Sequence, residues 1–143
     1  MGHQSLVYGI IEVFSCNSEV DKINRKALEE LPENDDAWPY LIRSMFNATF
    51  NEKLNVQYTY QVIHFGASYK EIECDWDDWL RKFETLLSKI CGISAIVHLE
   101  TERNGNHTYE WVATLPDSFM FNQPSTWEFL GGIRKFADPM GGA

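Results

Sequence analysis

The alternation of apolar and polar residues along the chain predicts several β-strands. Residues 5–15, SLVYGIIEVFS, are apolar at positions that would lie on both faces of a strand, which is typical of a strand in the centre of a sheet. Residues 54–65 alternate more strictly, so we expect a strand there with one exposed face. Gly66-Ala67-Ser68 predicts a turn that leads into a short strand at 69–73.

Apolar residues that recur at helical spacing predict helices between and after these strands. One begins at Ser18 and stops at Pro32, and another spans Trp38 to Phe46. The apolar run from Trp127 to Phe136 predicts a further short helix, which would contain Gly131-Gly132.

The clearest helical pattern follows Asp75, which we expect to act as the N-terminal cap. The apolar stripe comprises Trp76, Trp79, Leu80, Phe83, Leu86, Leu87 and Ile90. Gly92 stands where a left-handed residue commonly ends a helix. We therefore expect a helix over 76–90 that lies across the sheet, with Phe83 among the most buried residues.

A hairpin is predicted after this helix. Residues 93–102 and 107–115 flank Asn104-Gly105, a strong signal for a two-residue turn. Such a turn would place His98 opposite Trp111 and Glu100 opposite Tyr109.

Together these elements predict an α+β fold in a single domain spanning residues 1–143. Helices would pack on one face of a mainly antiparallel sheet, and a ferredoxin-like variant is one arrangement that fits. We expect the tail, about 138–143, to be disordered.

Composition narrows the class of function. The chain has 143 residues, with 12 basic and 21 acidic side chains and a net charge of -9. This balance opposes nucleic-acid binding, which relies on Lys and Arg, and it suits a basic protein partner. The three cysteines form no CxxC pair, and the chain carries no recognisable metal or cofactor motif, so none is expected. Without a leader-like start or a long apolar stretch, we expect a cytoplasmic protein with no membrane partner.

Acidic residues concentrate in two windows, one at 27–36 and one at 71–78. A helix dipole accounts for acids in the first turn of the helix after Asp75, but not for the acids near the end of the first helix. The other interpretation is that both windows steer a basic partner. The contact candidates on this interpretation are Glu29, Glu33, Asp35, Asp36, Glu71 and Glu73.

A second candidate site lies in the predicted hairpin. With the expected register, His98, Glu100 and Tyr109 would share one face of the sheet with Trp111, and a His–Glu pair can perform acid–base chemistry. A plain cross-strand pair explains the same residues, and no nucleophile motif accompanies them. A small enzyme or ligand-binding domain is therefore the alternative function.

Two stretches, GHQSLVYGIIE at 2–12 and HFGASYKEIECDWDDWLRKFETLL at 64–87, resemble small bacterial immunity proteins of polymorphic-toxin and contact-dependent inhibition systems. The resemblance implies a small, acidic, noncatalytic protein that binds and neutralises a cognate toxin domain. The net charge of the chain adds the expectation that this toxin domain is basic and attacks nucleic acid, because such domains need positive charge to hold phosphate. It assigns no functional residues. A protein-binding module of this kind is the first expectation for function.

Overall fold

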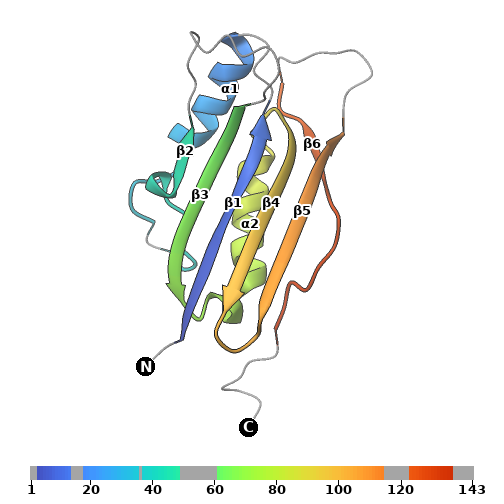
Figure 1. The fold of residues 1–143 in the computed structure, drawn as a ribbon. Helices are drawn as coiled ribbons and strands as arrows, with labels where there is room; N and C mark the ends of the chain where they lie inside the picture. Colours follow the sequence, from blue (N-terminus) through green and yellow to red (C-terminus); the bar gives the residue numbers. More distant parts are fainter. Residues whose placement is uncertain (1–2, 14–17, 36, 49–60, 115–122, 137–143) are drawn as a thin grey trace.

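The computed structural model describes residues 3–13, 18–35, 37–48, 61–114 and 123–136, and its fold is α+β (Figure 1). The strands are β1 (Gln4–Val13), β2 (Phe46–Ala48), β3 (Gln61–Lys70), β4 (Gly92–Thr101), β5 (Asn106–Thr114) and β6 (Thr126–Phe129). The α-helices are α1 (Ser18–Glu29) and α2 (Trp76–Leu87), and short 3-10 helices are η1 (Arg43–Met45) and η2 (Ile72–Asp75).

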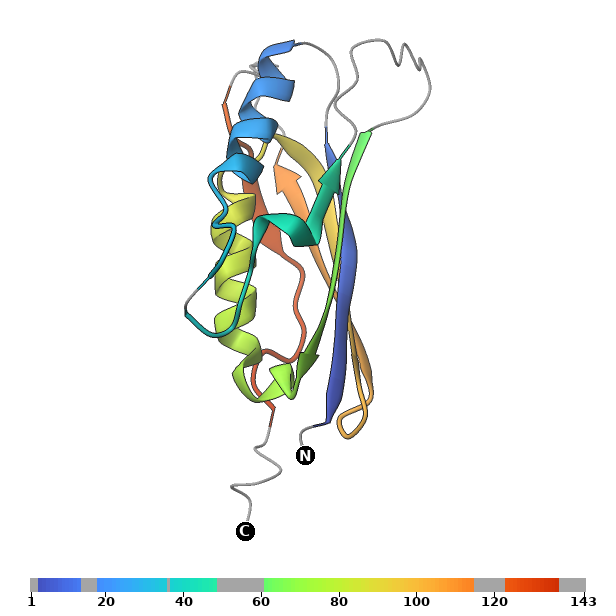
Figure 2. The same cartoon turned by 90° about the vertical axis from the view of Figure 1, so that its left-hand side faces the viewer.

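The described strands form one antiparallel sheet in the order β2-β3-β1-β4-β5-β6. Up to β4, the order of elements, βαββαβ, is that of ferredoxin-like domains, and β5 and β6 extend the sheet beyond β4. Figure 2 shows α1 and α2 on the same side of the sheet, and no described segment covers the opposite side. The expected α+β fold with helices on one sheet face is confirmed.

β1 is the central strand that the sequence predicts, because it pairs with β3 on one side and with β4 on the other. Its odd-numbered residues, such as Val7 and Ile11, are buried under the helices. Its even-numbered residues, such as Leu6 and Tyr8, point to the uncovered side. The strand is thus apolar on both faces, but only the residues on one face belong to the core. Those on the other face, such as Leu6 and Tyr8, are exposed.

α2 lies across the sheet and supplies the middle of the core, as its stripe predicts. Phe83 is fully buried, and its ring contacts those of Phe65, Trp79 and Trp111 at centroid distances of 5.2, 5.4 and 5.2 Å. The helix ends at Leu87 rather than at residue 90, although Ile90 is still buried. Aromatic packing from α2, β3 and β5 therefore joins the two layers.

α1 also forms where its apolar spacing predicts it. Ala27 and Leu28 belong to the core, and buried Asn24 binds the backbone of Cys91 through both its amide nitrogen and its oxygen, at 3.1 and 2.8 Å. These bonds satisfy the backbone N–H and C=O groups of buried Cys91, which lies between α2 and β4. They tie α1 to a segment 67 residues further along the chain.

The helix predicted over Trp38 to Phe46 is wrong. The segment is irregular up to η1 and then enters β2, where Phe46 pairs with Phe65. Asp35 accepts hydrogen bonds from the backbone N–H groups of Ala37 and Leu41, which holds the chain in a non-helical course. Pairing at the sheet edge outweighs a weak helical pattern here.

The turn predicted at Gly66-Ala67-Ser68 is also wrong, because these residues lie inside β3. Gly66 pairs with Tyr8 of β1, so the central strand carries β3 on to Lys70. The predicted strand from residue 54 falls for the most part on residues 49–60, which lie outside the described residues, as does the tail 137–143.

The helix predicted from Trp127 to Phe136 is replaced by β6 and an extended segment. Phe129 pairs with Trp111 at the edge of the sheet. Gly131 and Gly132 then take positive φ angles of 105° and 141°, which end the pairing and which side chains disfavour. The chain leaves β5 at this point and crosses towards α2.

The hairpin forms, but its register differs from the prediction. His98 pairs with Thr108 and Glu100 with Asn106. The hydroxyl of Thr101 accepts a hydrogen bond from the N–H of Asn104 and donates one to the carbonyl of Gly105. A turn longer than two residues therefore closes the hairpin. An odd shift in register moves every side chain of one strand to the other face.

No helix within the described ranges is both long enough and apolar enough to cross a lipid bilayer.

Candidate protein-binding face

The uncovered side of the sheet, called the open face below, is built from alternate residues of adjacent strands. Its rows can be read from the strand pairing: Tyr8 lies between Gly66 and His98, and Ile10 lies between His64 and Ile96. The residues of the open face are Gln4, Leu6, Tyr8, Ile10, Glu12, Asn47, Val62, His64, Gly66, Ser68, Lys70, Ser94, Ile96, His98, Glu100, Asn106, Thr108, Glu110, Val112, Thr114, Thr126 and Glu128.

Apolar side chains occupy the middle of this face. Those exposed by more than a third are Leu6, Tyr8, Val62 and Val112, at 39, 40, 37 and 38%. Ile10 and Ile96 lie between them and are half-buried. Scattered exposed apolar residues are ordinary, but residues from four neighbouring strands on one flat surface are typical of an interaction site.

Carboxylates of β1, β4, β5 and β6 lie beside these apolar side chains. Glu12, Glu100, Glu110 and Glu128 lie on the open face, and none of them forms an ion pair with a Lys or Arg of the described residues. Among the residues that the structure describes, Lys70 is the only Lys or Arg on this face. The open face is therefore apolar in its centre and negatively charged around it.

The basic residues gather instead on the helical side, where they neutralise many of the acids. Glu30 is near Lys26 and Lys89, at 4.0 and 3.3 Å, and Glu84 binds Arg134 at 2.6 Å. The four carboxylates of the open face have no such partner among the described Lys and Arg residues.

The structure places the first acidic window in a paired environment. Asp35 binds Lys82 at 2.7 Å, and Glu33 is 3.4 Å from Arg43. Burial raises the pKa of Asp35, and the hydrogen bonds from Lys82, Ala37 and Leu41 outweigh this, so that its pKa lies below its ordinary value. Glu29 is exposed, and Asp36 lies outside the described residues. The Asp35 carboxylate is therefore occupied by contacts within the fold, whereas Glu29 and Glu33 remain candidates for contact with a partner.

The second window is less available to a partner than the sequence indicates. Glu73 is buried, with 3% of its surface exposed, so the expectation of an exposed contact there is wrong. The reason is that η2 turns the chain inward between β3 and α2. Glu71 is half-buried and adopts a left-handed backbone conformation with φ 51°.

The structure separates the residues of the proposed catalytic alternative. His98 and Glu100 lie on the open face, whereas Tyr109 and Trp111 face the helices and are buried. The grouping of Tyr109 with His98 and Glu100 is therefore wrong. Its cause is the odd register shift of the hairpin.

A different tyrosine completes the open-face cluster. The Tyr8 hydroxyl donates to Glu100, and its ring lies 5.1 Å from that of His98, its neighbour on β4. The hydrogen bond to the Glu100 carboxylate holds the pKa of Tyr8 above its ordinary value. The alternation within residues 5–15 could have indicated Tyr8, because it falls on the same face as Leu6 and Ile10.

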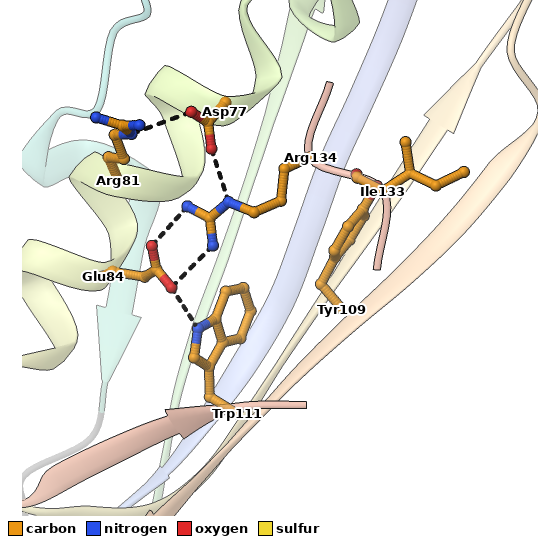
Figure 3. Close-up of polar contacts among 7 residues, drawn as sticks. All are labelled: Asp77, Arg81, Glu84, Tyr109, Trp111, Ile133 and Arg134. Atoms are coloured by element: carbon orange, nitrogen blue, oxygen red, sulfur yellow. Dashed lines mark hydrogen bonds and ion pairs between the residues drawn. The ribbon is translucent and has the colours of Figure 1, made fainter. Parts of the chain in front are cut away.

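On the helical side, the C-terminal segment is held to α2 by Arg134 (Figure 3). Its guanidinium group donates two bonds to Glu84, of 3.0 and 2.6 Å, and one of 2.7 Å to Asp77. Trp111 donates to the same Glu84 carboxylate, and Tyr109 donates to the carbonyl of Ile133. This network fixes the segment after β6 against the core.

The carboxyl groups of this network have lowered pKa values. Hydrogen bonding from Arg134 lowers the pKa of Asp77, whose burial acts in the opposite direction. Burial raises the pKa of Glu84, but the bonds from Arg134 and Trp111 more than offset it. Both groups are therefore stabilised in their charged form by the fold.

We predict that Arg134→Gln lowers the free energy of unfolding at neutral pH by about 1–3 kcal/mol, because it leaves the partly buried carboxylate of Glu84 without its cation and removes one of the two arginines that bind Asp77. The ordinary pKa values of Asp77 and Glu84 are 3.8 and 4.5, and both are depressed in the folded state. The stabilisation is thus complete above about pH 5 and is lost as the pH falls through the folded values. Urea unfolding at pH 7 and pH 3 should show the difference from the unchanged protein shrinking in acid. The exposed neighbour, Lys135→Gln, is the control, and an equal loss there would contradict the prediction.

On the helical side, hollows lie beside Trp76, Trp111 and Ala27, and neither His98 nor Glu100 lines these hollows. The hollow beside Trp111, of about 450 Å³, lies between α2 and β6 and is also lined by Trp127. Within the described ranges, no group of His, Cys, Asp and Glu side chains is placed to hold a metal ion.

The comparisons with known proteins add no relative: no family model matches the chain, and no curated protein or solved structure matches it.

Proposed function

We propose that the chain is a noncatalytic protein-binding module that engages a basic protein domain through its open face. More specifically, we propose that it is a bacterial immunity protein, which binds and neutralises a cognate toxin domain in the cytoplasm. The observation that carries the proposal is the apolar strip of the open face with four carboxylates beside it that no Lys or Arg of the described residues pairs.

The chemistry of this face fits a basic partner. Interfaces commonly have an apolar centre and a polar, charged rim. Unpaired carboxylates speed the encounter with a positively charged surface and disfavour acidic partners. A toxin domain that attacks nucleic acid needs a positive surface to hold phosphate, and it therefore offers the complementary charge.

A second copy of the chain fits this face less well. Face-to-face pairing would place the carboxylates of both copies in one interface, namely Glu12, Glu100, Glu110 and Glu128 of each. Like charges brought together in an interface oppose association. The charge of the face thus favours a partner of different, basic composition.

The alternative function, a small enzyme or ligand-binding domain, now rests on His98 and Glu100 with Tyr8. The cluster lies on a sheet surface, outside the hollows described above. General acid–base catalysis requires a substrate held within hydrogen-bond reach of both groups. Contact with a protein surface makes no such demand, so binding is the function that the geometry supports best.

The proposal predicts that Glu110→Lys/Glu128→Lys weakens binding of the partner by about 10–100-fold at low salt, because it reverses two of the four carboxylate charges of the proposed contact. The partner to test is the domain encoded by the neighbouring upstream gene, co-expressed and captured with this chain. Its affinity for the variants can be measured by calorimetry at two salt concentrations, and the difference should narrow at high salt.

The matched control is Glu29→Lys/Glu33→Lys, which makes the same change of charge on the helical side. We expect it to leave binding within about twofold at the higher, physiological salt concentration, since exposed charges separated by more than about 8 Å are largely screened there. Loss of binding in the control but not in the open-face variant would move the interface to the first acidic window. A neighbouring gene without a toxin-like domain, together with failure to recover a basic partner, would rule out the immunity function.

A further inference from the structure

A cluster of three side chains lies on β1 and β4 of the open face. Tyr8 and His98 are direct neighbours on β1 and β4, with ring centroids 5.1 Å apart. Tyr8 donates its hydroxyl hydrogen to Oε2 of Glu100. His98 is held from the other side by Thr108, whose Oγ1 is 3.1 Å from its Nδ1. The aromatic rings and the carboxylate are therefore positioned by cross-strand bonds rather than free to rotate.

The Glu100 carboxylate keeps most of its capacity to accept hydrogen bonds. An ionised carboxylate offers about four acceptor positions, and Tyr8 uses one of them. None of the described Lys and Arg side chains pairs with Glu100. Its direct neighbour on β1 is the apolar Leu6, which would exclude water once a partner covers the face.

An exposed aromatic ring beside a carboxylate that has no cationic partner is suited to binding an arginine side chain. A guanidinium group is planar, so it can lie over an aromatic ring while donating two parallel bonds to a carboxylate. A lysine ammonium group can form the ion pair but cannot match the planar stacking and the paired bonds. Phosphate and carboxylate ligands are opposed by the charge of Glu100.

We infer that Tyr8, His98 and Glu100 form a receptor for an arginine side chain of the protein partner. The inference rests on the proposed function, because it names the group through which the partner is anchored. Tyr8 provides the ring surface, Glu100 accepts the guanidinium N–H groups, and His98 supports the ring. Arginine residues buried at the centre of an interface are frequent energetic hot spots.

The direct test uses a small probe and the folded full chain. N-acetyl-arginine amide is titrated into isotope-labelled protein and followed by NMR, with N-acetyl-lysine amide as the comparison at equal ionic strength. We expect saturable shifts of the Tyr8, His98 and Glu100 signals, with an affinity for the arginine probe about threefold or more above that for lysine. Equal affinities, or shifts spread evenly over Glu12, Glu110 and Glu128, would overturn the inference.

Variants on the exposed face separate the parts of the receptor. Glu100→Gln should reduce the affinity for the arginine probe by about fivefold or more, because the charge is removed while the shape is kept. Tyr8→Leu should abolish the preference for arginine over lysine. Glu110→Gln is the matched control on the same face and should leave the probe affinity within about twofold. A Glu100→Gln variant that stays folded and binds the probe unchanged would overturn the receptor.

The same variants distinguish this inference from the proposed function when the partner domain is used. If Glu110→Lys/Glu128→Lys weakens partner binding and Glu100→Gln does not, the open face is the interface and the arginine receptor is wrong. If neither variant changes partner binding, the open face itself is wrong. Loss of partner binding in both variants is the result expected.

Discussion

Replacing Phe83 with alanine is expected to lower the free energy of unfolding by about 3–5 kcal/mol, the range for truncating a fully buried phenylalanine. The ring contacts Phe65 of β3, Trp79 of α2 and Trp111 of β5, so its removal leaves a cavity among large rigid rings. Such a loss is a large part of the stability of a typical domain. Chemical denaturation, followed by the fluorescence of the core tryptophans, measures it directly.

The control for this variant is Asp78→Asn, on the exposed side of the same helix. Asp78 lies in the first turn, and its charge contributes a helix-dipole interaction of well under about 1 kcal/mol when exposed. A Phe83→Ala loss no larger than that of the control would contradict the central place of Phe83 in the core.

Gly9→Ala is expected to destabilise the protein by about 3 kcal/mol, at the upper end of the usual cost of overpacking. Gly9 lies in the middle of β1, and a Cβ atom there would stand 2.0 Å from the carbonyl oxygen of Ile96 and 2.9 Å from the ring of Phe65. The first obstacle is backbone of the paired strand, so relief requires β1 and β4 to separate. Thermal and denaturant unfolding should both report the loss.

Gly66→Ala tests the same change in the neighbouring strand. A Cβ atom at Gly66 meets nothing closer than the Cβ atom of Tyr8, at 3.6 Å, which is ordinary contact. We expect a change within about 0.5 kcal/mol, as for substitutions at uncrowded surface positions. Similar losses in the two variants would mean that glycine is required for strand flexibility rather than for the close approach at Gly9.

Local periodicity was sufficient to predict β1, α1 and α2. Each of these elements buries a stripe of its own residues, and a stripe is a property of neighbouring positions in the chain. Phe83 could be recognised as a core residue for the same reason. The acidic excess and the class of partner that it suits also follow from composition alone.

Where the local pattern was weak, pairing with the sheet decided which secondary structure formed. Phe46 and Phe129 occur in runs with helical spacing, yet both pair with a core strand at an edge of the sheet. Positive φ angles at Gly131 and Gly132 then turn the last segment towards α2. Propensity is worth only tenths of a kcal/mol per residue, so long-range strand pairing outweighs it.

The register of the hairpin explains why the predicted catalytic group of His98, Glu100 and Tyr109 does not form. The Thr101 hydroxyl closes the hairpin across a turn longer than Asn104-Gly105 alone indicates. This shifts the register by an odd number of residues, so Tyr109 enters the core while His98 and Glu100 face outward. Turn type depends on side-chain bonds that residue preferences describe only in part.

The sequence by itself determined that this chain would form an α+β fold with an aromatic core and carry an excess of negative charge. Only the tertiary structure decided where that charge is available. Asp35 meets Lys82, and Asp77 meets Arg134, across 47 and 57 residues of chain, so these acids are neutralised within the fold. Glu12, Glu100, Glu110 and Glu128 are scattered in the sequence, yet strand pairing gathers them beside an exposed apolar strip. Ion pairing depends on distance in space, which the spacing of charges along a chain does not contain.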